Sequence, residues 1–119
     1  LMDRYFYTSA VYQASSGLKP EEILQIYIEF GVPVPDLTFL FDCSPYLCFV
    51  RANKRNRLTG GRHLFSTSPE RIAEIRERYL SLMGGREEVR VVDSSRPISK
   101  VNGDLITEID SLFFYKTWR

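Results

Sequence analysis

The sequence predicts an α/β fold in which a parallel sheet is flanked by helices. Two short apolar runs, residues 37–41 and 89–92, are each followed by an aspartate and have the length of buried strands. Helical patterns lie before, between and after these runs, and strands that alternate with helices are typical of a parallel sheet. The 119 residues are enough for one small domain.

The first part of the chain predicts the end of a buried strand followed by two helices. The opening residues LMDRYFY resemble the tail of a strand, and a helix is expected over residues 6–15. A second helix is expected over residues 20–30, because Pro20 suits a first helical turn and Gly31 suits the position just after a helix.

The second part of the chain continues the alternation of strands and helices. We expect a strand over 37–41, a helix from Pro45, a helix over 69–83, a strand over 89–92 and a helix over 98–113. Ser44 and Ser68 each precede a proline and suit the N-cap position. The polar, glycine-containing residues 54–63 predict that the helix from Pro45 fades into a mobile segment.

Composition excludes some classes of function. The chain is 44% hydrophobic and 26% charged, with a formal net charge of only +1, so no global field favours nucleic acid or an acidic membrane. No apolar run approaches the ~20 residues that span a bilayer, and the opening residues lead us to expect no signal peptide. Cys43 and Cys48 match no common zinc or redox spacing, and we expect two buried free thiols in a reducing compartment, the cytoplasm.

Three polar segments follow predicted strands, at Asp3–Arg4, Asp42–Cys43 and Asp93–Ser94. Ligands of parallel α/β sheets bind beyond the carboxyl ends of the strands. We therefore expect these three segments to lie on one rim and to border the functional site.

The first candidate site is the segment 3–13. Asp3 could hold a magnesium ion through water, and Arg4 could grip phosphate oxygens with two hydrogen bonds. Thr8, Tyr12 and Gln13 could face the same cavity and suit a nucleoside. The alternative is an ion pair at a strand end beside a half-buried helix.

The second candidate site is a basic segment. Residues 51–63 contain Arg51, Lys54, Arg55, Arg57 and Arg62 and no acidic residue. A mobile basic segment near strand ends could close over phosphates and exclude water. The alternative is a solvated charge run or a patch that binds nucleic acid.

The third candidate site is the loop within residues 91–101. It could present backbone groups and small side chains to a base, or it could be an ordinary strand-to-helix connection.

Together these segments resemble the thymidylate kinase family. The matching stretches are Asp3-Arg4-Tyr5 with Thr8 and Val11-Tyr12-Gln13, then Pro35 to Asp42, then Val91 to Ile98. Val11 and Ser94 replace the usual alanines, and Phe65 is followed by Ser66 rather than by glutamate. No GxxxxGK[ST] occurs in the chain.

The resemblance implies part of a P-loop nucleoside monophosphate kinase fold, with residues 1–119 forming one partial domain. It implies a lid over about 51–66, and an N-terminal P-loop half that we expect in the same or a companion chain. It also implies transfer of a phosphoryl group from ATP to dTMP with Mg²⁺, and a homodimer. We expect residues 1–119 alone to be inactive as a kinase.

The resemblance also assigns roles to single residues. On the acceptor side it implies that Asp3 lies near Mg²⁺, that Arg4 holds the dTMP phosphate, that Thr8 and Gln13 bind around the thymine and that Tyr12 packs near the deoxyribose. The lid candidates are Arg51, Arg55, Arg57 and Arg62. The residues implied beside the adenine are Ser95, Arg96 and Pro97. Two alternatives stay open. One is another nucleotide or nucleoside kinase of the same fold, and the other is a non-catalytic remnant that binds a nucleotide or a partner.

Overall fold

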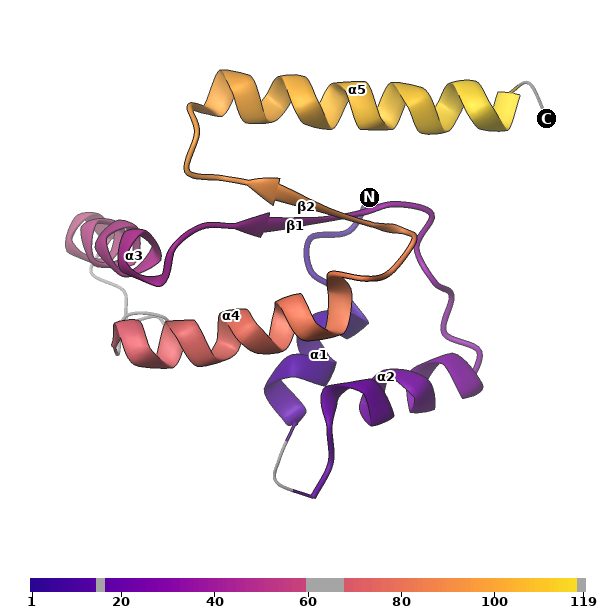
Figure 1. The fold of residues 1–119 in the computed structure, drawn as a ribbon, viewed down its shortest axis with the longest axis horizontal. Coiled ribbons are helices and arrows are strands. Elements are labelled where there is room, and N and C mark those ends of the chain that lie inside the picture. The colour runs from indigo at the N-terminus through magenta and orange to yellow at the C-terminus, as the bar shows by residue number, and fades with distance from the viewer. Residues whose placement is uncertain (15–16, 60–67, 118–119) are drawn as a thin grey trace.

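The computed structural model describes residues 1–14, 17–59 and 68–117 and confirms the α/β class. Along the chain the elements are α1 (Phe6–Gln13), α2 (Pro20–Glu29), β1 (Thr38–Asp42), α3 (Pro45–Thr59), α4 (Pro69–Met83), β2 (Val89–Asp93) and α5 (Ile98–Thr117). Figure 1 shows α5 on one side of the two strands and α1, α2 and α4 on the other.

The two strands pair in parallel, as the sequence predicts. Their register runs from Thr38 opposite Val89 to Asp42 opposite Asp93, so the two aspartates end the strands side by side. Side chains alternate between the two faces along a strand, so Asp93 and Val89, four residues apart on β2, share a face. Asp42, which is paired with Asp93, lies on this face too, and Val89 packs into the core beside α1 and α4. The opposite face carries Arg90, which forms an ion pair with Glu108 of α5 at 3.1 Å.

The main core lies between the sheet and the helices α1, α2 and α4. Its buried members are Phe6, Tyr7, Ala10, Val11, Ile23, Leu24, Ile75, Leu82, Met83 and Val89. Tyr7 is also tied to the start of β2, because its hydroxyl donates to Glu88 Oε1 at 2.6 Å. Arg86 Nε donates to the same carboxylate oxygen at 2.5 Å. The core therefore holds α1, which carries the first candidate site, firmly beneath the sheet.

The predicted helix boundaries are confirmed at several caps. Ser44 Oγ accepts the Leu47 N–H at 3.2 Å, and Ser68 Oγ accepts the Arg71 N–H at 3.1 Å. These bonds satisfy backbone donors that a helix start leaves without partners. Gly31 follows α2 with a φ of 83°, a left-handed conformation that glycine adopts without steric cost.

The prediction of a strand at the N-terminus is wrong. Among the described residues the sheet contains only β1 and β2, and Asp3 and Arg4 form a bend instead. Arg4 has a φ of 62°, which is incompatible with an extended strand. Only the Asp42 and Asp93 ends therefore share a strand-end rim, and Asp3 comes before α1 without belonging to the sheet.

The helix that was expected to fade into residues 54–63 instead continues to Thr59. Lysine, arginine and leucine are good helix formers, and Ala52 is buried on the packed side of α3. Lys54, Arg55 and Arg57 are therefore helical. Residues 60–66, including Arg62, lie outside the described residues, and the role of 51–66 as a lid stays a prediction.

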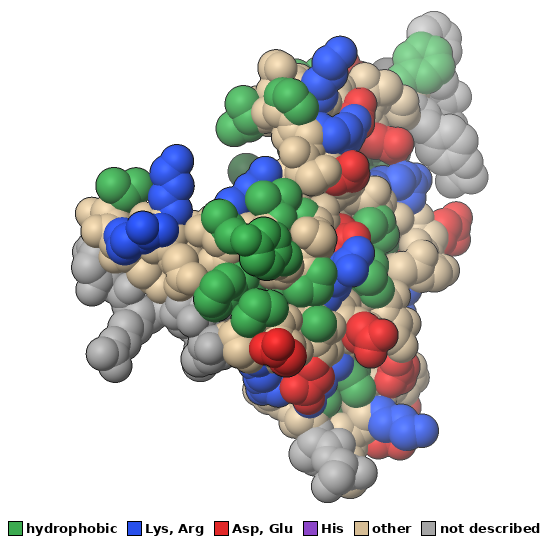
Figure 2. Space-filling model, turned by 60° about the vertical axis from the view of Figure 1, so that its left-hand side comes forward, with side chains coloured by type: hydrophobic (Ala, Val, Ile, Leu, Met, Phe, Trp, Pro, Cys, Tyr) green, Lys and Arg blue, Asp and Glu red, His purple; other side chains and the backbone are tan. Residues whose placement is uncertain are grey.

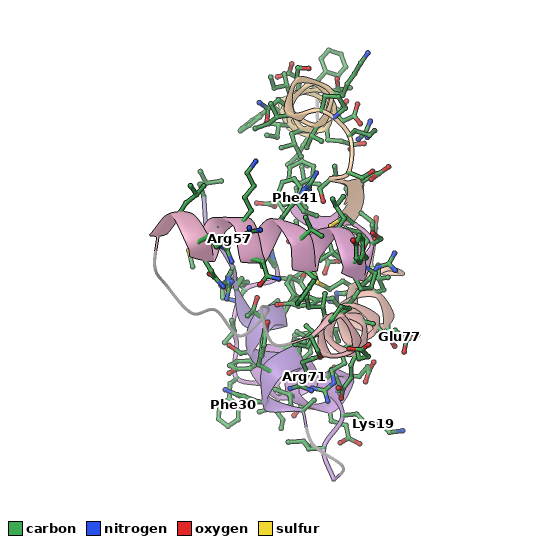
Figure 3. The ribbon with its side chains drawn as sticks, turned by 90° about the vertical axis from the view of Figure 1, so that its left-hand side faces the viewer. Lys19, Phe30, Phe41, Arg57, Arg71 and Glu77 are labelled. Atoms are coloured by element: carbon green, nitrogen blue, oxygen red, sulfur yellow. The ribbon has the colours of Figure 1, made fainter. Side chains whose placement is uncertain are left out.

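Apolar side chains gather on the face between α3 and α5 (Figure 2). Figure 3 shows Phe41 in this region, and its side chain is 54% exposed although it belongs to a strand. On α5, Ile98 and Ile106 are also exposed. Within the described ranges no helix is both long and apolar enough to cross a membrane.

Candidate functional site

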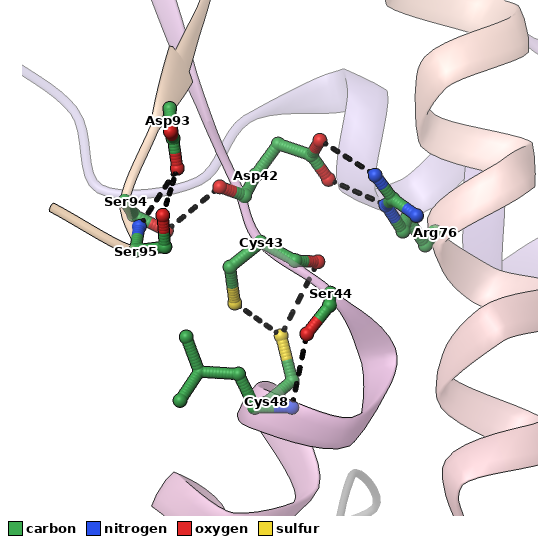
Figure 4. Close-up of polar contacts among 9 residues, drawn as sticks. Asp42, Cys43, Ser44, Cys48, Arg76, Asp93, Ser94 and Ser95 are labelled. Atoms are coloured by element: carbon green, nitrogen blue, oxygen red, sulfur yellow. Dashed lines mark hydrogen bonds and ion pairs between the residues drawn. The ribbon is translucent and has the colours of Figure 1, made fainter.

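The carboxyl end of the sheet joins β1 to the loop that follows β2. Ser94 donates two hydrogen bonds to the backbone carbonyl of Asp42, from its N–H at 2.8 Å and from its hydroxyl at 3.0 Å. Figure 4 shows this junction together with the side chains around it. The loop after β2 is thereby held in a fixed position at the rim.

The carboxylate of Asp42 is occupied by a structural partner. Arg76 of α4 donates from Nε to Oδ1 at 2.7 Å and from Nη2 to Oδ2 at 3.0 Å. Its hydrogen bond with Asp42 raises the pKa of Arg76 above the ordinary arginine value. This two-point pair fixes α4 against the end of β1, so Asp42 supports the rim and does not offer an open ligand.

The loop after β2 is shaped by its own side chains. Ser95 donates to Asp93 Oδ1 from its N–H at 2.9 Å and from its hydroxyl at 2.5 Å, and these bonds lower the pKa of Asp93. Arg96 bonds the Asp93 carbonyl at 3.1 Å and pairs with Asp104 of α5 at 2.7 Å. Pro97 is exposed and precedes α5 directly. Of the three residues predicted at a base, Ser95 and Pro97 remain exposed to solvent.

Asp3 and Arg4 are both exposed, immediately before α1. The left-handed backbone of Arg4 costs a non-glycine residue about 1–2 kcal/mol. Their neighbour Tyr5 anchors this bend, because its hydroxyl donates to the Pro33 carbonyl at 2.9 Å. Strain of this kind is frequent at ligand sites.

The predicted residues of α1 meet two residues of α4 that sequence reasoning did not assign to the site. Tyr79 donates its hydroxyl to Thr8 Oγ1 at 3.2 Å, and its ring meets the ring of Tyr12 edge-on at 6.4 Å between centroids. Burial and the neighbouring Tyr79 raise the pKa of Tyr12, while the positive charges of Arg4 and Arg71 act in the opposite direction.

These five residues, Arg4, Thr8, Tyr12, Arg71 and Tyr79, are called the α1–α4 cluster below. Gln13 ends α1 and is exposed. The spacing of Ile72, Ile75 and Tyr79 places Tyr79 on the apolar face of α4. A tyrosine hydroxyl on the otherwise apolar face of α4 is the sequence signal that could have identified Tyr79 as a candidate site residue.

The arginines of α3 have different surroundings. Arg51 Nη1 donates to the Ser94 carbonyl at 2.9 Å, which links α3 to the loop after β2. Arg57, labelled on α3 in Figure 3, borders a shallow hollow of about 430 Å³ whose lining includes Asn53 and Asn56. Arg55 is exposed one turn beyond Arg51. Arg51 is thus linked to the loop after β2, Arg55 and Arg57 lie further along α3, and their role as lid residues stays a prediction.

A magnesium site made of protein groups alone is not present among residues 1–14, 17–59 and 68–117, because no three metal-binding side chains cluster there. Magnesium commonly uses one or two carboxylates and completes its shell with phosphates and water. The exposed carboxylate of Asp3 is one ligand of the kind that such a site uses, and its role at Mg²⁺ stays a prediction.

Comparison with known proteins points to a single family. The family model for thymidylate kinase matches residues 1–105. The thymidylate kinase of Leptospira interrogans serovar copenhageni is 35% identical over 83 residues, which are 70% of this chain and 39% of that protein. A probable thymidylate kinase of Archaeoglobus fulgidus is 28% identical over 116 residues, 98% of this chain and 55% of that protein.

The chain therefore spans about half the length, or less, of these curated relatives. No solved structure matches it. The match over residues 1–105 covers the bend at Arg4, the α1–α4 cluster, α3 and the loop after β2. By this match, the chain belongs to the thymidylate kinase family.

Proposed function

We propose that the protein containing this chain transfers the γ-phosphoryl group of ATP to dTMP, giving dTDP. The observation that carries this proposal is the α1–α4 cluster, in which the Thr8 hydroxyl is bonded to Tyr79, the Tyr12 ring packs against the Tyr79 ring, and the positive charge of Arg4 acts on Tyr12. These groups suit a phosphate, a base and a sugar respectively. Family membership supplies the reaction class.

The acceptor nucleotide binds along α1. Arg4 is exposed and not held in the sheet, so its guanidinium can clamp the dTMP phosphate. Thr8 accepts a hydrogen bond from Tyr79 and keeps its own hydroxyl hydrogen for an acceptor atom such as a thymine carbonyl oxygen. Gln13 offers an amide from the end of α1, and Tyr12 packs beside the deoxyribose.

The donor nucleotide binds beside the loop after β2. Ser95 and Pro97 face solvent and border the adenine, while Arg96 keeps the loop in shape through Asp93 and Asp104. Arg51 supports the same loop through the Ser94 carbonyl. Asp3 lies near the Mg²⁺ that accompanies the phosphates, and Arg55, Arg57 and Arg62 are the remaining candidates that reach them from the lid.

Residues 1–119 contain no GxxxxGK[ST], so we propose that another segment of the same or a companion chain cradles the ATP phosphates. Two features support a neighbour at β1: the strand is paired on one edge only within the described chain, and Phe41 is 54% exposed. We also propose a homodimer, for which the exposed Ile26 of α2 and Phe30, which directly follows α2, offer apolar surface. The free thiols suit the reducing cytoplasm.

An acceptor series tests the proposal. With the complete protein, ATP and Mg²⁺, ADP release is measured for dTMP, CMP and AMP in a coupled assay. We expect dTMP to have the highest kcat/KM. CMP as the best acceptor would favour another nucleotide kinase of the same fold, and binding of nucleotide without turnover would favour a non-catalytic protein.

A matched pair of variants tests the acceptor side. Thr8→Val removes the hydroxyl and should raise KM for dTMP with little change in KM for ATP. Thr8→Ser keeps the hydroxyl and should stay close to the parent protein. Equal changes of both KM values in Thr8→Val would show that Thr8 only supports packing.

A further inference from the structure

The two cysteines meet at the junction of β1 and α3. Cys43 directly follows β1, and Cys48 lies in the first turns of α3. Their Sγ atoms are 2.7 Å apart, and Cys48 Sγ also lies 3.9 Å from the Cys43 carbonyl oxygen. Figure 4 shows the two sulfurs facing each other across the start of the helix.

The surrounding contacts impose this approach. Asp42, the residue before Cys43, is held by Arg76 and by Ser94. On the other side, Ser44 caps α3 and fixes the direction of the helix that carries Cys48. A disulfide has an S–S distance of about 2.05 Å. A shift of roughly 0.6–0.7 Å would therefore bring the two sulfurs to bonding distance.

We propose that Cys43 and Cys48 are a site of reversible oxidation, which forms an intramolecular disulfide when the protein meets a hydroperoxide. This is independent of the nucleotide chemistry proposed above. Both side chains are partly exposed, so a small peroxide can reach them.

The order of the two steps follows from the surroundings of the sulfurs. Burial, together with the bond to Cys43, raises the pKa of Cys48 to about 12, so Cys48 keeps its proton at neutral pH. The thiolate is the nucleophile that attacks a peroxide, so we assign the first step to Cys43 and the second to Cys48, which the start of α3 holds against the sulfur and carbonyl oxygen of Cys43.

The reaction balances in two steps. The Cys43 thiolate forms an S–O bond to the peroxide, the O–O bond breaks, and the departing hydroxide takes up a proton, leaving a sulfenic acid and one water. The sulfur of Cys48 then attacks the Cys43 sulfur, the S–O bond breaks, and the proton of Cys48 leaves with the oxygen as a second water. Two thiols are oxidised by two electrons, and one hydrogen peroxide is reduced to two waters.

Peptide mapping tests the product in the complete protein. Trypsin releases both cysteines in one peptide, residues 5–51, because Lys19 precedes a proline. After hydrogen peroxide, this peptide should lose the mass of two hydrogens and resist iodoacetamide, and dithiothreitol should reverse both changes. Continued alkylation of both thiols, or bridging only between separate chains, would overturn the proposal.

Single variants test the order of the steps, and a redox titration tests the contribution of the fold. Cys48→Ser should leave Cys43 as a sulfenic acid that dimedone traps, whereas Cys43→Ser should label much more slowly; equal labelling would overturn the assignment of Cys43.

In glutathione buffers, the effective concentration of the two thiols should be at least about tenfold higher in the folded protein than in urea. No difference would mean that the fold does not bring them together.

Discussion

Arg4 combines an exposed guanidinium with a backbone conformation that costs free energy. A left-handed residue other than glycine costs about 1–2 kcal/mol, and it persists only where its surroundings hold it. Tyr5 supplies such a constraint through its hydrogen bond to the Pro33 carbonyl. A glycine at this position relieves the backbone strain and removes the guanidinium. Stability measurements therefore report on the strain, and kinetic measurements report on the side chain.

We predict that Arg4→Gly leaves the complete protein as stable as the parent or up to about 1 kcal/mol more stable. Relief of the left-handed strain is worth about 1–2 kcal/mol, and the greater freedom of glycine in the unfolded chain offsets about 0.5–1 kcal/mol of it. Loss of the phosphate clamp should cost ~2–4 kcal/mol of transition-state stabilisation, so kcat/KM for dTMP should fall roughly 30- to 900-fold.

Urea unfolding and steady-state kinetics on the same preparation check this prediction for Arg4. Arg4→Lys is the matched control, because it keeps both the charge and the backbone strain. Near-normal kinetics in Arg4→Gly would show that the guanidinium has no part in the reaction.

Glu88 has a structural role that depends on pH. Burial alone would raise the pKa of Glu88, but the hydrogen bonds from Tyr7 and Arg86 outweigh burial and hold it below the ordinary value of 4.5. A carboxyl group with a lowered pKa in the folded state stabilises the protein above its unfolded pKa, and this stabilisation is lost as the pH falls through the folded pKa.

We predict that the free energy of unfolding decreases below about pH 4.5 and that Glu88→Gln flattens this decrease. At the alkaline end, burial and Glu88 raise the pKa of Tyr7 from 10.0 to about 12, so the stabilisation from neutral Tyr7 is lost as the pH rises from 10 towards 12. Urea midpoints measured from pH 3 to pH 8 check the acid limb. An unchanged acid slope in Glu88→Gln would contradict the role given to this carboxylate.

The helices are set in place by caps that the sequence makes visible. Ser68 begins α4 by accepting the Arg71 N–H, and α4 carries both Arg76, which holds Asp42, and Tyr79, which holds Thr8. A weaker start of α4 therefore affects two parts of the candidate site at once.

We predict that Ser68→Ala lowers the free energy of unfolding by about 1 kcal/mol, because the cap bond is lost. Ser68→Asp restores an oxygen acceptor and adds a favourable charge at the helix start, so it should recover most of that loss. Chemical unfolding of both variants measures the effect. Equal stability of Ser68→Ala and the parent protein would mean that the cap bond contributes nothing.

Arg51 connects α3 to the loop after β2 through the Ser94 carbonyl. We predict that Arg51→Ala raises KM for ATP more than KM for dTMP, because we propose that Ser95 and Pro97 in that loop border the adenine. Initial rates with each substrate varied in turn measure this, with Arg57→Ala as a comparison on the same helix. Equal increases of both KM values would contradict the link to the donor side.

Local chemistry made most elements predictable, and the two elements that were predicted wrongly also depend on local features of the chain. The strand runs, Pro20, Ser44, Ser68 and Gly31 gave boundaries close to the observed ones. The polarity of residues 54–59 predicted a mobile segment, but these residues are helical, because lysine, arginine and leucine are good helix formers. The aromatic start of the chain suggested a strand, but Arg4 has a backbone that leaves the extended region.

The candidate site was predictable where its residues are close in sequence. Asp3, Arg4, Thr8 and Tyr12 lie within a few residues of one another, so one motif contains them. The hydrogen bond from Tyr79 to Thr8 and the electrostatic influence of Arg71 on Tyr12 join positions more than fifty residues apart, and only the packing of α4 on α1 brings them together. Arg62 lies outside the described residues, and its part in the lid stays a prediction.

At the scale of the whole molecule, the described chain forms a helical layer around a sheet of two strands. One edge of β1 has no partner within residues 1–14, 17–59 and 68–117, and Phe41 and Ile98 leave apolar surface on the side of α5. Exposed apolar surface beside an open strand edge favours docking of further structure. This agrees with the proposal that another segment supplies the phosphate-binding loop.

The most direct test of the proposed function is identification of the product by phosphorus NMR. The complete protein, and separately residues 1–119, are incubated with ATP, Mg²⁺ and dTMP after cooperative unfolding of each sample has been verified. We predict that the complete protein forms dTDP and ADP in equal amounts, and that residues 1–119 alone form none, because in-line transfer needs the β- and γ-phosphates held in place. No dTDP from the complete protein would contradict the proposed kinase activity. Sustained dTDP formation by residues 1–119 alone would contradict the proposal that another segment must bind the ATP phosphates.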